Sequence, residues 1–175
     1  KMYIERIEKY DKKGPSINSV IMINPNALEI ARKMDKEFLE SGITKPLHGI
    51  PVLLKDNINT KDMPTTAGSL ALDGVIPSED AYITQKLKEA GAIILAKVNL
   101  HEFAVWGETI SSILGQTLNP YDLTRTPGGS SGGTSAGIAA NFGIIGIGTD
   151  TINSIRSPAS ACSLVGLRPT IGLVS

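Results

Sequence analysis

The stretch from Gly128 to Arg156 decides the fold, because it joins two serine-containing loops through a helix and a strand. It opens with Gly128-Gly-Ser-Ser-Gly-Gly133 and closes with Gly148-Thr-Asp-Thr-Ile-Asn-Ser-Ile-Arg156. The small residues between them predict a helix over residues 134–141 that packs tightly against a sheet, and the apolar run that follows predicts a strand over residues 143–148. The helix and strand therefore place both serine-containing loops in one layered α/β structure.

Upstream, short apolar runs alternate with amphipathic segments. Apolar spacing of three and four residues predicts helices, and short buried runs next to glycine predict strands. We predict helices over residues 3–12, 27–41, 78–90 and 100–105, with Ser78 as the N-cap of the third, and strands over residues 50–54 and 92–96. Strands alternating with helices favour an α/β fold with a mainly parallel sheet. No repeat or internal linker interrupts the pattern, so we predict one domain over residues 1–175.

Composition excludes several function classes. The 175 residues carry 17 basic and 17 acidic side chains, so no net charge favours nucleic acid or an anionic membrane as a partner. No apolar run reaches the ~18 residues of a membrane span. Cys162 is the only cysteine, so no disulfide forms within the chain. These features leave the compartment undetermined: the cytoplasm is favoured, and a secreted or cell-surface form with a removed leader stays open because the chain starts at Lys1.

Serine chemistry here would need a base other than histidine. The two histidines, His48 and His101, precede both serine loops, and Lys55 follows a buried apolar run. Residues 129–133 match the Gly-x-Ser-x-Gly elbow around Ser131, but that motif needs a strand directly before it and a later histidine. The glycine loop lacks the Gly-Lys-Ser/Thr of a phosphate-binding loop, and His101-Glu102 lacks a second zinc-spaced histidine. We therefore predict neither a metal nor a cofactor.

Several ordered motifs together resemble the amidase signature family, the serine hydrolases with a Ser–cis-Ser–Lys triad. The resemblance covers nearly the whole chain and is weakest over the first twenty-five residues. The matching runs are Pro46-Leu-His-Gly-Ile-Pro-Val-Leu-Leu-Lys-Asp-Asn57, Gly91-Ala-Ile-Ile-Leu-Ala-Lys-Val-Asn-Leu-His-Glu-Phe103, Gly128-Gly-Ser-Ser-Gly-Gly133, Ser135-Ala-Gly-Ile-Ala-Ala140, Gly148-Thr-Asp150, Ser154-Ile-Arg156, Pro158-Ala159 and Gly166-Leu-Arg-Pro-Thr170. The resemblance implies a layered α/β/α fold with a mixed, mainly parallel central sheet. It also implies that this chain is the N-terminal portion of an amidase catalytic domain.

The resemblance assigns a role to each site residue. Ser154 is the nucleophile, Ser130 the bridging cis-serine and Lys55 the base, and Ser131 is a candidate substrate-binding residue. Oxyanion donors would be the backbone N–H groups of Thr151, Ile152, Asn153 and Ser154. A lysine accepts a proton near pH 7 only if burial disfavours its charged form, and residues 52–54 would bury Lys55.

One departure from the family pattern concerns Ile152-Asn153, which replace the usual Gly-Gly before the nucleophile. A β-branched isoleucine adopts left-handed backbone conformations poorly, so we predict an ordinary conformation for Ile152 and a narrower acyl site. Asp150 and Arg156 are expected to form a structural pair that fixes this loop. His48, His101 and Cys162 are expected to have structural roles, the last as a small buried residue.

The predicted function is hydrolysis of a small-molecule carboxamide through a serine acyl-enzyme, with release of ammonia or an amine. Residues 47–55 and 62–69 look most like the peptide-amidase and general-amidase branch. An alternative is the glutaminase subunit of a tRNA-dependent amidotransferase, which would act with a protein partner. An alternative of another class is a catalytically silent binding protein, motivated by Ile152-Asn153. We predict no nucleic-acid or membrane partner, and a homo-oligomer stays open.

Overall fold

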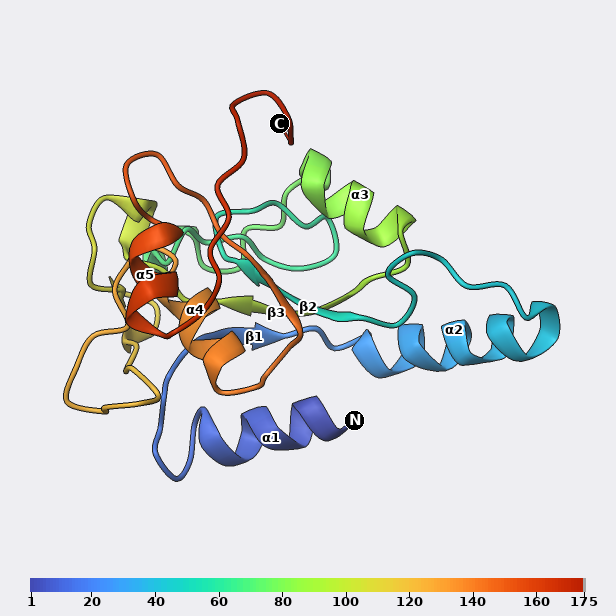
Figure 1. Ribbon diagram of the computed structural model, residues 1–175, viewed down its shortest axis with the longest axis horizontal. Coiled ribbons are helices and arrows are strands. Elements are labelled where there is room, and N and C mark those ends of the chain that lie inside the picture. The colour runs from blue at the N-terminus through green and yellow to red at the C-terminus, as the bar shows by residue number, and fades with distance from the viewer. Residues whose placement is uncertain (175) are drawn as a thin grey trace.

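The computed structural model describes residues 1–174, built around a four-stranded mixed sheet with the strand order β1-β3-β2-β6 (Figure 1). The strands are β1 (Val20–Ile23), β2 (Pro51–Lys55), β3 (Ile93–Val98) and β6 (Ile145–Ile147). Strand β2 pairs in parallel with both β3 and β6, whereas β1 runs antiparallel to β3. The mixed, mainly parallel sheet is therefore confirmed, and β2 lies between two partners, as its continuous apolar run predicts.

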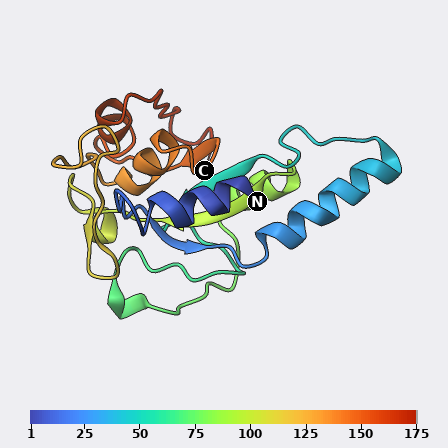
Figure 2. The ribbon, with the colours of Figure 1, turned by 90° about the horizontal axis from the view of Figure 1, so that it is seen from below.

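Helices surround this sheet, and short irregular elements connect them. The helices are α1 (Met2–Tyr10), α2 (Ala27–Ser41), α3 (Tyr82–Glu89), α4 (Gly132–Ala139) and α5 (Arg156–Ala161), with 3-10 turns η1 (Leu70–Leu72) and η2 (Glu102–Ala104). A two-stranded hairpin, β4 (Ile110–Ser111) and β5 (Gly115–Gln116), lies in the long loop before α4. Figures 1 and 2 show that α2 projects away from the other elements.

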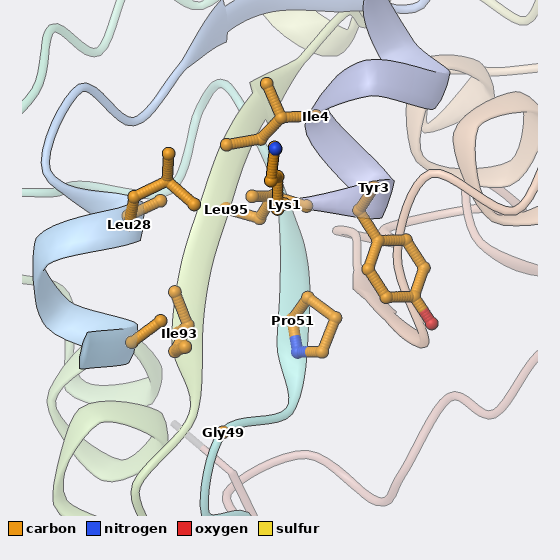
Figure 3. A pocket seen from close by; sticks show the side chains of 10 residues that line it. Lys1, Tyr3, Ile4, Leu28, Gly49, Pro51, Ile93 and Leu95 are labelled. Atoms are coloured by element: carbon orange, nitrogen blue, oxygen red, sulfur yellow. The ribbon is translucent and has the colours of Figure 1, made fainter. Parts of the chain in front are cut away.

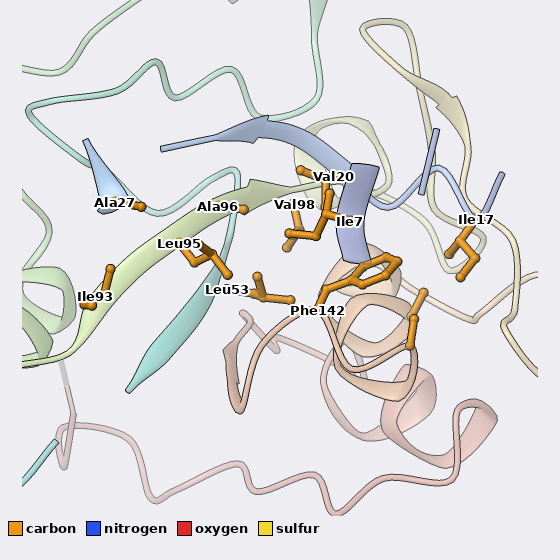
Figure 4. Packing of buried hydrophobic residues seen from close by; sticks show 12 residues of the cluster. Ile7, Ile17, Val20, Ala27, Leu53, Ile93, Leu95, Ala96, Val98 and Phe142 are labelled. Atoms are coloured by element: carbon orange, nitrogen blue, oxygen red, sulfur yellow. The ribbon is translucent and has the colours of Figure 1, made fainter. Parts of the chain in front are cut away.

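Two apolar clusters cover opposite faces of the sheet, which makes the structure three-layered. On one face, Leu53 packs with Phe142 and with Ile7 of α1, and α4 contributes Ala136 (Figure 4). On the other face, Val52 and Leu54 pack with Ile58, Met63 and Leu87 of α3. Because side chains alternate along a strand, Lys55 follows Leu53 onto the α4 face. This alternation is what positions the candidate site.

Close approach of α4 to the sheet depends on its small residues. A side chain at Gly137 would meet Leu53 Cδ1 at 2.8 Å, and one at Gly133 would collide with the backbone N and O of Asn99. The Gly133 N–H donates to the Asn99 carbonyl at 3.1 Å, so the start of the helix is held directly against the end of β3. The tight packing predicted for this helix is confirmed.

Three local expectations were wrong or incomplete. Ser78 is not an N-cap, because α3 begins at Tyr82 after Ala81; the Asp80 carboxylate instead accepts a hydrogen bond from the Lys61 N–H at 2.9 Å and pairs with Lys88. Residues 100–105 form a 3-10 turn over 102–104 rather than a regular helix. Strand β1 and helix α5 were not predicted, because four residues and six residues are too short for a periodic signal.

A small hollow lies at the end of β2 opposite Lys55. Pro51 and Leu95 line it together with Tyr3 and Ile4 of α1 and Leu28 of α2 (Figure 3). Its cavity volume is about 140 Å³. The hollow lies where β2 begins, whereas the residues with chemical potential gather where β2 ends. Over residues 1–174, none of the helices combines the length and apolarity that a membrane crossing requires.

Candidate active site

Lys55, the last residue of β2, is fully buried and points its amine at two hydroxyl groups. Its Nζ donates to Ser130 Oγ at 2.7 Å and to Thr149 Oγ1 at 2.7 Å, with a longer contact to the Thr149 carbonyl at 3.4 Å. No carboxylate lies within ion-pair distance of this amine among residues 1–174. The end of β2 therefore presents a buried amine to a serine hydroxyl.

Burial changes the protonation of this lysine. Desolvation lowers the pKa of Lys55 to about 7, and the more distant Asp150 carboxylate opposes the decrease only in part. A buried ammonium without a paired carboxylate loses its hydration and gains little in exchange. At neutral pH a large fraction of Lys55 is therefore an uncharged amine, which can accept a proton.

The serine loop before α4 lies between Lys55 and the long loop after β3. Ser130 and Ser131 are buried, and the peptide bond between Gly129 and Ser130 is cis. The Ser130 carbonyl accepts a hydrogen bond from the His101 N–H at 3.1 Å. A side chain at Gly129 would lie 2.7 Å from the Gly107 backbone, so glycine is required there by packing. The cis peptide implied by the family resemblance is present.

Ser154 lies beside Ser131 and is half-buried. Its carbonyl accepts a hydrogen bond from the Ser131 N–H at 3.1 Å, which places it next to the residue that follows Ser130. The Ser154 hydroxyl itself forms no hydrogen bond to any residue from 1 to 174, so the structure joins Lys55 to Ser130 but leaves the Ser154 hydroxyl free. A free hydroxyl on this loop is available to a bound substrate.

The loop over residues 151–154 leaves its backbone donors unused. In the described part of the chain, the N–H groups of Thr151, Ile152, Asn153 and Ser154 donate no hydrogen bond. Neither Ile152 nor Asn153 has a positive φ, so the ordinary conformation predicted for Ile152 is confirmed. The Ile152 side chain is 81% exposed and is therefore placed where an incoming molecule can contact it.

Asp150 holds the end of the loop over residues 151–154 in place. Its carboxylate pairs with Arg156 at 3.1 Å and accepts the backbone N–H groups of Ile155 and Arg156 at 3.0 and 3.3 Å. Burial would raise the pKa of Asp150, but the hydrogen bonds from Arg156 and Ile155 lower it to about 2. Arg156 also donates to the Ile152 carbonyl. The predicted structural pair is confirmed.

Two further residues belong to the site although sequence reasoning did not select them. Thr149 accepts from Lys55 through its hydroxyl, and Asn57 Nδ2 donates to the same hydroxyl at 3.1 Å. Ser131 Oγ, which we expected to bind substrate, is in contact with the Thr149 carbonyl at 3.2 Å and the Thr149 N–H at 3.3 Å. Thr149 lies inside the quoted Gly148-Thr-Asp150 motif, and that position was the available signal.

Other side chains with reactive or metal-binding potential lie elsewhere. Cys162 is buried, and burial raises the pKa of its thiol to about 11, so it stays protonated as a small core residue. Within residues 1–174, no cluster of three or more His, Cys, Asp or Glu side chains could hold a metal ion. Of the described side chains, Lys55 is the titratable one that forms a hydrogen bond to the Ser130 hydroxyl.

Comparison with known proteins identifies the family to which this site belongs. The family model described as Amidase matches residues 1–175. This chain belongs to the amidase signature family. Its fold also matches solved amidase structures: native peptide amidase from Stenotrophomonas maltophilia is 48% identical with a TM-score of 0.94, over 99% of this chain and 36% of that one.

Relatives of a second kind are about as similar to this amidase-family chain. A glutamyl-tRNA(Gln) amidotransferase subunit of Methanococcoides burtonii is 46% identical over 99% of this chain and 34% of its own length. The solved structure of the corresponding subunit from Thermotoga maritima is 38% identical with a TM-score of 0.82, over 99% of this chain and 35% of that one. The chain thus spans about a third of the length of the curated relatives it matches.

Replacing Lys55 by methionine should stabilise the fold at low pH. The pKa of Lys55 is about 7 when folded and 10.5 in its ordinary state, so the unfolded chain binds more protons between these values. Stability of the unchanged protein therefore rises with pH from about 7 to 10.5, and the full penalty for burying the ammonium acts below pH 7. Methionine removes that penalty but leaves the Ser130 and Thr149 hydroxyls without their donor. The net increase in the free energy of unfolding should be on the order of 2 kcal/mol at about pH 6.

Thermal unfolding at several pH values checks this expectation. The Lys55→Met variant should have a higher Tm than the unchanged protein at about pH 6, and the difference should shrink as pH approaches about 10. A difference in Tm that stays constant over this range would show that Lys55 is charged in the folded protein.

Proposed function

We propose that this protein is an amidase that cleaves the C–N bond of a carboxamide through an acyl-enzyme on Ser154. The observation that carries the proposal is the buried Lys55 amine, 2.7 Å from Ser130 Oγ and without an ion-paired carboxylate in the described chain. An alcohol is a weak nucleophile at neutral pH, and an adjacent base activates it. With a pKa of about 7, Lys55 has the proton affinity that general-base catalysis near neutral pH requires.

Acylation transfers one proton along the line of these side chains. Ser154 Oγ attacks the carbonyl carbon while Ser130 accepts the Ser154 proton and passes its own to Lys55 Nζ. The unused N–H groups of residues 151–154 donate to the oxygen that becomes negatively charged. Lys55 then returns a proton through Ser130 to the departing nitrogen, so the C–N bond breaks with release of ammonia or an amine. Water, activated along the same path, cleaves the ester and restores Ser154.

Peptide amides are the first substrates to test, because the solved peptide amidase is 48% identical to this chain. The protein at its natural full length should release ammonia from a C-terminally amidated dipeptide, with ammonia measured by a coupled enzyme assay. Ser154→Ala should release none, and Ser160→Ala, an exposed serine on α5, should act as the unchanged protein does. Ammonia release that persists in Ser154→Ala would overturn the proposal.

A second candidate is the ammonia-supplying subunit of a tRNA-dependent amidotransferase, favoured by the 46% identity to the amidotransferase relatives. The same chemistry would then act on glutamine and would need a protein partner. Glutamine hydrolysis that requires a co-purified partner, with no hydrolysis of peptide amides, would select this candidate. Absence of both activities, with a correctly folded protein, would select the silent binding protein.

Ile152 is expected to limit the size of the acyl group. Its exposed side chain projects from the loop whose N–H groups would bind the oxyanion. Ile152→Gly should raise kcat/KM for a bulky acyl amide about tenfold relative to a small one, since one or a few methylenes in a pocket change selectivity by such factors. Asn153→Gly is the matched control. Equal changes for bulky and small amides in Ile152→Gly would show that this side chain does not contact the acyl group.

A further inference from the structure

A second buried lysine, Lys97, lies one strand away from Lys55 and takes no part in the proposed reaction. Lys97 on β3 pairs in register with Leu54 on β2, whereas Val98 pairs with Lys55. Neighbouring residues of a strand point to opposite faces, so the two lysines lie on opposite sides of the sheet. Both side chains are fully buried. The two buried amines differ in the groups that surround them.

Lys97, unlike Lys55, has a carboxylate within ion-pair distance. Its Nζ lies 2.8 Å from Asp56 Oδ1, and it donates to the Pro64 carbonyl at 3.0 Å and to Thr65 Oγ1 at 2.8 Å. The Pro64 and Thr65 contacts are hydrogen bonds, whereas Asp56 Oδ1 is an ion-pair partner that accepts no hydrogen bond within residues 1–174. Burial lowers the pKa of Lys97, and the charge of Asp56 opposes that decrease. The pair is therefore a compensated ion pair in the interior.

Asp56 is the residue directly after Lys55 in the chain. Its Oδ2 accepts the Thr66 N–H at 3.0 Å and the Thr66 hydroxyl, while Oδ1 faces Lys97. Its backbone is held as well, because its N–H donates to the Val98 carbonyl at 3.0 Å. The carboxylate closest in sequence to Lys55 is thus directed to the other face of the sheet and is neutralised there.

The groups around Lys55 contrast with those around Lys97, because no carboxylate lies within ion-pair distance of Lys55 in the described chain. Lys55 contacts hydroxyls of Ser130 and Thr149, and the charge that opposes the lowering of its pKa is that of Asp150, which pairs with Arg156. An opposite charge within about 4–6 Å of a lysine would favour its ammonium form by about one pKa unit or more. An amine that must accept a proton near neutral pH has to avoid such a partner.

We propose that Lys97 is a positioning residue that binds the Asp56 carboxylate on the far face of the sheet, so that Lys55 keeps no anionic partner. The inference rests on the proposed function, because it explains how Lys55 stays uncharged. The polar contacts of Lys97 in the described chain are to Asp56, Pro64 and Thr65, and none is to Ser130. It acts through Asp56, by holding the one carboxylate that the chain places next to the base.

Removing Lys97 alone should impair the base, and removing both charges should restore it. In Lys97→Met, the Asp56 carboxylate keeps its two Thr66 donors but loses its cation, so its charge acts on Lys55. Because this charge acts from the opposite face of the sheet, the midpoint of the acidic limb of Ser154 acylation should then rise by about half a pH unit, which is about twofold slower acylation at about pH 7. The double variant Asp56→Asn with Lys97→Met has no net charge to act on Lys55, and its midpoint should return to that of the unchanged protein.

The test follows the rate of fluorophosphonate labelling of Ser154 from about pH 5.5 to about pH 9.5 in the protein at its natural full length, a range that spans the titration of a lowered lysine. Lys88→Met is the matched control, because Lys88 is also ion-paired to a buried carboxylate, Asp80, but lies on α3. Its midpoint should not move. A Lys97→Met midpoint equal to that of the unchanged protein would overturn the inference.

The double variant separates positioning from folding. A purely structural role for Lys97 predicts that Lys97→Met lowers the Tm, that the double variant regains it, and that neither variant moves the midpoint of acylation. That result also overturns the inference, as does a double variant whose midpoint stays raised. Failure of the proposed function is recognised separately, because the unchanged protein would then show no labelling of Ser154 at any pH.

Discussion

Lys55→Ala is expected to slow acylation of Ser154 about 1,000-fold at about pH 8, the scale on which a positioned general base acts. The substitution removes the amine that lies 2.7 Å from Ser130 Oγ, so no group is left to accept the proton that the serines relay. The unchanged protein should gain rate as pH rises through about 7, where Lys55 loses its proton. Lys55→Ala should lose that rise together with the rate. Labelling rates with a fluorophosphonate across this pH range measure both effects.

A control for this variant is a lysine on the surface of α3. Lys86 on α3 is exposed and pairs with Glu89, so Lys86→Ala should change neither the rate nor its pH dependence. If Lys55→Ala still labels at a rate within about tenfold of the unchanged protein, a different group accepts the proton and the Lys55 assignment is wrong.

Gly133→Ala is expected to destabilise the fold by about 3 kcal/mol, the upper range for overpacking a core. An added Cβ would collide with the backbone N and O of Asn99, and backbone atoms at the end of β3 cannot rotate away as a side chain can. Helix α4 would have to shift, and with it the loop that carries Ser130. Chemical denaturation of the protein at its natural full length measures the change in the free energy of unfolding.

Gly137→Ala is the matched comparison in the same helix. Its Cβ would meet only Leu53 Cδ1 closely, the end of a flexible side chain, and alanine favours a helix over glycine by roughly 1 kcal/mol. We therefore expect a change in unfolding free energy below about 1 kcal/mol for Gly137→Ala. Equal losses for the two variants would show that α4 does not depend on contact with Asn99.

Sequence patterns predicted the helices and strands whose composition or residue spacing is distinctive over several consecutive residues. The buried run before Lys55 predicted a central strand, and small residues over 134–141 predicted a helix that packs closely, because burial on both faces and close approach each leave a mark on composition. Strand β1 escaped prediction because four residues alternate too few times to be distinguished from a loop. Its antiparallel pairing with β3 is a long-range contact that local spacing does not encode.

The candidate site was predicted to a different extent for each residue. Family resemblance selected Lys55, Ser130 and Ser154, and the structure brings the first two to 2.7 Å. Thr149 and Asn57 were missed, because their importance comes from where their side chains meet around the Lys55 amine in space. The Asp56–Lys97 pair was also invisible in sequence, since residues far apart in the chain become partners only when β2 and β3 pair.

The most direct test of the proposed triad is the site of covalent labelling by a fluorophosphonate, read by intact mass and peptide mapping. We predict one adduct, on Ser154, that is lost in Ser154→Ala and in Lys55→Ala and retained in Ser131→Ala. An adduct that maps to Ser131, or that persists in Ser154→Ala, would contradict the assignment of Ser154 as a nucleophile activated by Ser130 and Lys55.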